Sequence, residues 1–105
     1  MNLDVLIFGA HPDDAELAMG GTIAKLTKND LKVGIIDLTR GELGTRGTAE
    51  TRQREAFNAA ITLKVSVREN LEIPDGDIGK TKENLMKVII GMRKFKPKIV
   101  FAPYF

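Results

Sequence analysis

Residues 5–14 read Val-Leu-Ile-Phe-Gly-Ala-His-Pro-Asp-Asp, and this stretch decides the expected fold. It begins as a continuous apolar run and ends in polar residues, which is typical of a strand covered on both faces that leads into a loop. Two further apolar runs of this kind occupy residues 33–36 and 99–101. A weaker strand is predicted near residues 67–73. The chain therefore contains four predicted strands.

Helical patterns separate these strands. They cover about residues 15–28, 49–63 and 82–95, and Pro97 stops the last one. Strict alternation of strands and helices predicts an α/β fold, a parallel, doubly wound sheet with helices on both faces. Gly20 and Gly21 interrupt the first helical pattern, and we expect that helix to pack closely on the sheet there.

The chain shows no repeat and no interdomain linker, so residues 1–105 are expected to form the N-terminal part of a single domain. The sequence stops at Phe105, directly after the fourth predicted strand. A sheet of this class ordinarily continues, and we expect the chain to be truncated at its C-terminal end.

The composition excludes several classes of function. The 16 basic and 14 acidic residues give a formal net charge of +2 and alternate over most of the chain, which argues against a nucleic-acid partner. There is no cysteine, so thiolate metal sites and disulfides are excluded and a cytoplasmic location is expected. The apolar run near the N-terminus has about six residues, too few for a signal segment or a membrane span.

The residues after the first strand carry the candidate chemistry. In open α/β sheets, ligands bind beyond the carboxyl ends of the strands, where His11, Asp13 and Asp14 are expected. His11 and Asp14 are suited to hold one metal ion, with Asp13 beside them as a base for a bound water. The alternative is that His11 is a structural histidine and that both aspartates only cap the following helix.

Arg52 is a candidate for binding substrate. On the second predicted helix it falls on the apolar stripe of Ala49, Ala56 and Ala60, so its side chain is expected to point inward. An inward guanidinium either binds a substrate carboxylate or oxyanion in the crevice, or forms a structural ion pair with a neighbouring carboxylate. The residues alone leave both interpretations open.

Two loops at the same edge of the sheet carry weaker candidates for contact with a substrate. The loop at residues 39–47 contains three glycines and carries Arg46, and it is either a substrate-binding lid or a plain solvated connection. The turn at residues 74–76 follows the third strand and carries Asp75, a further candidate for substrate contact.

The motifs together resemble a known family, the PIG-L/LmbE-type zinc-dependent N-acetylglucosaminide deacetylases, and they are most similar to its bacillithiol-biosynthesis branch. The matching segments run through the chain in order: Ala-His-Pro-Asp-Asp-Ala-Glu at residues 10–16, Gly-Gly-Thr at 20–22, the run at 39–48, Arg52, and Pro-Asp-Gly at 74–76. The resemblance implies a Rossmann-like fold and hydrolysis of an N-acetylglucosamine conjugate, such as its malate glycoside, to acetate and a free amine.

The resemblance also implies roles for single residues. Zn²⁺ would be bound by His11 and Asp14, Asp13 would be the general base, and Arg52 would bind substrate or stabilise the oxyanion. The only partner expected is a small-molecule N-acetylglucosamine conjugate, with no nucleic acid and no membrane, and the protein is expected to form a homo-oligomer.

One departure from the family pattern affects activity. The family takes a third zinc ligand from a His-Pro-Asp-His-like motif that follows the strand at residues 99–101, whereas His11 is the sole histidine of this sequence. We therefore expect the 105-residue polypeptide to bind zinc weakly and to be inactive or nearly so. Two other functions stay open: a Mg²⁺- or Mn²⁺-dependent phosphohydrolase, and a non-catalytic sugar- or nucleotide-binding module.

Overall fold

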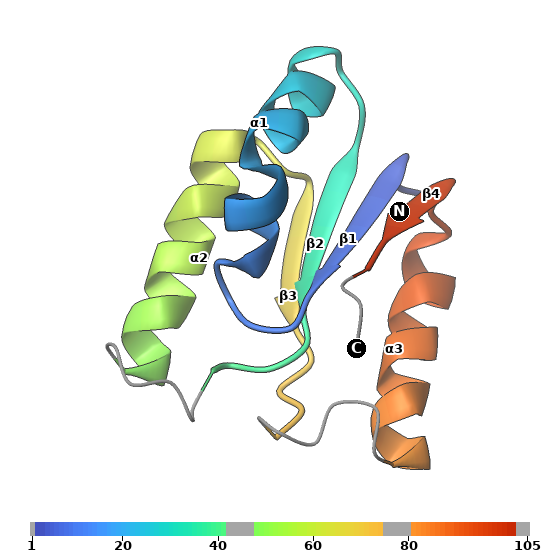
Figure 1. Ribbon diagram of the computed structural model, residues 1–105. Coiled ribbons are helices and arrows are strands. Elements are labelled where there is room, and N and C mark those ends of the chain that lie inside the picture. The colour runs from blue at the N-terminus through green and yellow to red at the C-terminus, as the bar shows by residue number, and fades with distance from the viewer. Residues whose placement is uncertain (1, 42–47, 75–80, 103–105) are drawn as a thin grey trace.

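The alternating pattern of the sequence folds into a four-stranded sheet with three helices (Figure 1). The computed structural model describes residues 2–41, 48–74 and 81–102. The elements, in chain order, are β1 Val5–Gly9, α1 Asp14–Lys28, β2 Val33–Asp37, α2 Ala49–Leu63, β3 Val67–Asn70, α3 Lys82–Phe95 and β4 Ile99–Phe101. All the predicted elements are present, and β3 ends three residues earlier than expected.

The sheet is parallel throughout, as predicted, with the strand order β3-β2-β1-β4. Val5 pairs with Val33 on one side and with Ile99 on the other. This order equals that of the first four strands of a Rossmann fold, in which ligands bind where the order reverses, here between β1 and β4. The carboxyl ends of β1, β2 and β3 lie together at the lower end of Figure 1.

Helices cover both faces of the sheet, which confirms the predicted fold class. α1 and α2 lie on one face and α3 lies on the other (Figure 1). The α1 face buries Val5, Ile7, Ala15, Ile23, Val33 and Ile35. The α3 face buries Leu3, Leu6, Phe8, Ile36, Leu38, Ile73 and Phe95. Because successive side chains of a strand point to opposite faces, the continuous apolar runs of β1 and β2 supply both layers.

β4 corrects one expectation. Its three residues were expected to be covered on both faces, but Ile99, Val100 and Phe101 are 54%, 37% and 41% exposed. The physical reason is their place in the sheet. Among the described strands β4 pairs with β1 alone, and the buried side chains of α1 and α3 pack mainly on β1 and β2.

The two glycines of α1 give a second correction. Close packing was expected at Gly20 and Gly21, but a Cβ atom added at either would meet no described atom within 4 Å outside the backbone of the helix itself. Ile23 and Met19 define the face of α1 that packs on the sheet, and a rotation of about 100° per residue turns both glycines away from it. None of the helices described is long and apolar enough to cross a membrane.

Candidate metal and catalytic site

The loop that carries the predicted metal ligands is fixed to the end of β2. Both the backbone N–H and the Oγ1 hydroxyl of Thr39 donate hydrogen bonds to the carbonyl of Ala10, at 3.1 and 3.0 Å. The amide of Leu38 donates to the carbonyl of Gly9 at 2.8 Å. The ladder between β1 and β2 therefore continues to the residue before His11, and the candidate site begins from a rigid base.

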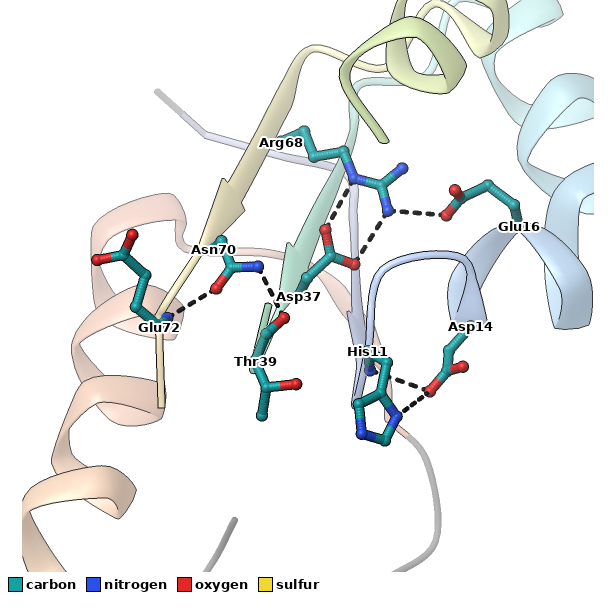
Figure 2. Close-up of polar contacts among 8 residues, drawn as sticks. All are labelled: His11, Asp14, Glu16, Asp37, Thr39, Arg68, Asn70 and Glu72. Carbon is teal, nitrogen blue, oxygen red and sulfur yellow. Dashed lines mark hydrogen bonds and ion pairs between the residues drawn. The ribbon is translucent and has the colours of Figure 1, made fainter. Parts of the chain in front are cut away.

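His11 and Asp14 converge, as predicted. Nδ1 of His11 lies 3.6 Å from Oδ2 of Asp14, and the same oxygen accepts a hydrogen bond of 3.0 Å from the backbone N–H of His11 (Figure 2). Both side chains are partly exposed, so an ion can reach them from solvent.

The pair fits a zinc ion as two of its ligands. Nitrogen and oxygen ligands on one tetrahedral Zn²⁺ lie about 3.4 Å apart, given metal–ligand bonds of about 2.1 Å, and the separation in the structure is 3.6 Å. Within residues 2–41, 48–74 and 81–102 there is no group of three histidine, cysteine, aspartate or glutamate side chains placed to hold a metal.

Asp13 adopts a strained backbone conformation. It precedes the first residue of α1 with φ 91° and ψ −27°, and its side chain makes no capping hydrogen bond to the helix. Non-glycine residues held in sparsely populated backbone regions cost about 1–3 kcal/mol each, and such residues cluster at functional sites. The interpretation that both aspartates simply cap the helix does not hold for Asp13, whose carboxylate is not used in this way.

Arg52 lies on the inner side of α2, as the apolar stripe predicts. Ala56 is buried and Arg54 is exposed, whereas Arg52 is half-buried. Its guanidinium rests against Gly41, where an added Cβ would lie 2.6 Å from Nη1. The amide of Gly41 donates to Oγ1 of Thr39 at 3.1 Å, so Arg52 is held near the loop that also anchors the His11 segment. The role of Arg52 stays a prediction.

Arg46 and Asp75, the other two predicted substrate contacts, lie outside the described residues. Arg46 belongs to residues 42–47 and Asp75 to residues 75–80. Their roles stay predictions from the sequence. The segments that flank them end at Gly41 and Pro74, beyond the carboxyl ends of β2 and β3.

A buried ionic cluster, which the sequence reasoning missed, lies behind the loop. Arg68 of β3 donates from Nε and Nη2 to the two carboxylate oxygens of Asp37 at 2.9 and 3.0 Å, and its Nη2 also lies 2.9 Å from Oε1 of Glu16 (Figure 2). The side chains of Arg68 and Asp37 are only 6% and 3% exposed. The sequence signal that could have predicted this cluster is Asp37, a charged residue at the end of the apolar run of β2.

Burial governs the protonation of this cluster. It raises the pKa of Asp37 from 3.8 to about 6, although the hydrogen bonds and the charge of Arg68 act in the opposite direction. The nearby carboxylates of Glu16 and Asp14 raise that pKa further. Two carboxylates, those of Asp37 and Glu16, share the buried guanidinium of Arg68.

A mostly apolar cleft of about 540 Å³ opens beside the candidate ligands. Asp14 lines it together with apolar side chains of α1 and β1, and Phe101 of β4 forms another wall. The cleft lies where the strand order reverses, which is the expected position of a ligand in a sheet of this kind.

Comparison with known proteins identifies relatives along most of the chain. The profile of the family described as PIG-L, GlcNAc-PI de-N-acetylase, matches residues 6–105. A diacetylchitobiose deacetylase of Thermococcus kodakarensis is 33% identical over 94% of this chain and 40% of its own length. The crystal structure of the conserved protein TT1542 of Thermus thermophilus is 43% identical with a TM-score of 0.90, over 97% of this chain and 46% of that one.

A third relative catalyses a different reaction. The structure of 4-carboxy-2-hydroxymuconate hydratase from Pseudomonas putida is 27% identical, with a TM-score of 0.78, over 95% of this chain and 46% of that one. The chain thus spans less than half the length of each of these three relatives.

Proposed function

The chain belongs to the PIG-L family, the family of the GlcNAc-PI de-N-acetylases, and from this premise we propose that it supplies the catalytic motif of a zinc-dependent deacetylase. The reaction is hydrolysis of the N-acetyl group of an N-acetylglucosamine conjugate, such as its malate glycoside. The observation that carries the proposal is the pair His11 and Asp14, with donor atoms 3.6 Å apart at the end of β1 and Asp13 between them.

Each residue of the motif has a separate task. His11 and Asp14 would hold the zinc ion, which would polarise the amide carbonyl and lower the pKa of a water to about 7. Asp13 accepts the proton of the attacking water and passes it to the leaving nitrogen, so that the C–N bond breaks to acetate and an amine. Arg52 binds an anionic group of the substrate or the developing oxyanion.

The remaining parts of the proposal concern the setting of the reaction. We place the protein in the cytoplasm as a homo-oligomer whose only partner is the small-molecule substrate, with no nucleic acid and no membrane. The absence of cysteine supports the cytoplasmic location, and the balanced charges argue against a nucleic-acid partner.

Zinc titration by calorimetry tests the ligand pair. The 105-residue chain is expected to bind Zn²⁺ weakly, and Asp14→Asn is expected to abolish the binding. Asp30→Asn is the matched control, because it removes one carboxylate near the other end of α1. Equal zinc affinity of both variants would refute the site. Tighter binding of Mg²⁺ or Mn²⁺ than of Zn²⁺ would favour a phosphohydrolase instead.

Acetate release tests the reaction. In a longer version that supplies a third ligand, Asp13→Ala is expected to lose several orders of magnitude in rate while zinc affinity is retained. The second candidate function comes from the hydratase relative, a protein of similar structure whose name describes water addition and not amide hydrolysis. Conversion of an unsaturated carboxylic acid without acetate release would favour that candidate. Sugar binding by metal-free protein with neither reaction would indicate a binding module.

A further inference from the structure

Arg68 connects three elements through one side chain. It starts on β3, at one edge of the described sheet, pairs with Asp37 at the carboxyl end of β2, and reaches Glu16 in the first turn of α1 (Figure 2). Its guanidinium is almost entirely buried, so these contacts are shielded from water and from salt.

Both ends of this connection lead to the candidate site. Glu16 follows Asp14 by two residues, and the next amide, that of Leu17, donates to the carbonyl of Asp13 at 2.8 Å. On the other side, Asp37 lies two residues before Thr39, which holds the carbonyl before His11. The ionic cluster therefore lies next to both ends of the segment that contains the ligand pair. Glu16 follows the segment, and Asp37 is close in sequence to Thr39, which binds the residue before it.

Pro12 and Ala15 of this segment are buried, whereas the residues that carry the proposed chemistry are not packed in the apolar core. The side chains of His11 and Asp14 are partly exposed, and Asp13 holds a backbone conformation that persists only where its surroundings enforce it. A buried ionic cluster is a weak source of net stability, since desolvation offsets much of the attraction between the charges. A role in orienting the first turn of α1 explains why the ionic cluster is buried there, whereas its small net contribution to stability does not.

We propose that Arg68 is a positioning residue, which acts through Glu16 to hold the first turn of α1, and with it Asp13 and Asp14, in the geometry that binds the metal. This inference rests on the proposed function for the identity of the metal. It concerns how the ligand segment is oriented, and no reacting atom touches Arg68.

Glu16→Ala is the informative variant, because it cuts the link to α1 and leaves the pair between Arg68 and Asp37 in place. We expect the Leu17 amide to exchange its hydrogen at least roughly tenfold faster while that of Ile23, deeper in α1, is unchanged. Zinc affinity should fall by about tenfold, the effect typical of residues that orient metal ligands. Glu16→Gln keeps an acceptor for Arg68 and should restore most of both properties.

Glu69→Ala is the matched control, because Glu69 neighbours Arg68 on β3 but forms an exposed ion pair with Lys94. It should change neither the exchange of Leu17 nor zinc affinity. The proposal is overturned if Glu16→Ala leaves Leu17 exchange unchanged, or if Leu17 and Ile23 accelerate equally, which indicates global loosening. If neither the unsubstituted chain nor the longer version binds zinc, the proposed function fails, and the exchange of Leu17 still decides the positioning role.

Discussion

Replacing Asp13 with glycine should give a more stable chain than replacing it with alanine, and both changes remove the proposed general base. At φ 91° the native residue holds a conformation that glycine adopts without steric cost. Relief of that strain raises the free energy of unfolding by roughly 1–2 kcal/mol. The greater conformational freedom of glycine in the unfolded chain lowers it by about 0.4–1 kcal/mol. A net gain of about 1 kcal/mol is expected relative to Asp13→Ala, which retains the strain.

The comparison with Asp13→Ala isolates the backbone contribution. Both variants lose the carboxylate near the N-terminus of α1, and with it the same favourable interaction with the helix dipole. Urea unfolding measures the difference directly, and thermal unfolding should show it as a rise of about 4–8 °C for a chain of this size. Equal midpoints for the two variants would show that the backbone at this position stores no strain. Zinc affinity should be similar in both, because Asp13 is not a proposed ligand.

Three further predictions concern stability. Gly20→Ala should raise the free energy of unfolding by about 0.5–1 kcal/mol in a urea titration, because the position is helical and open. Gly41→Ala should lower it by about 1–2 kcal/mol and displace Arg52, because φ is +69° and the new Cβ meets Nη1, and nuclear magnetic resonance of the guanidinium reports that displacement. The pKa of Asp37 is about 6 in the folded state and 3.8 in the unfolded state, so the folded state keeps the proton to a higher pH. The contribution of this group to the free energy of unfolding is therefore complete below pH 3.8 and is lost as the pH rises through 6. The loss is about 3 kcal/mol at 1.36 kcal/mol per pH unit, and Asp37→Asn should remove this part of the pH dependence of unfolding.

Elements set by local pattern could be predicted from the sequence. The expected helices at residues 49–63 and 82–95 coincide with α2 and α3, because apolar periodicity and the stop at Pro97 are local properties. The approach of His11 to Asp14 was likewise predictable, since only Pro12 and Asp13 separate them in the chain.

Features set by register and by neighbouring elements could not be predicted in the same way. The contact between Arg68 and Asp37 depends on how β3 aligns with β2, a relation that no local pattern encodes. The exposure of β4 depends on its place at the edge of the described sheet, although its composition matches that of the buried strands. The orientation of Gly20 follows from which face of α1 packs on the sheet, and a helix interrupted by glycine does not reveal that face by itself.

The outer rim of β4 has a practical consequence for work with the isolated polypeptide. Among the strands described, it has hydrogen-bonding groups on one side with no neighbouring strand, flanked by the apolar side chains of Ile99 and Phe101. Such a rim is a template for strands of other molecules. Concentrated samples should therefore scatter light and precipitate. Ile99→Lys should keep them clear without disturbing the proposed metal ligands at the far end of the neighbouring strand.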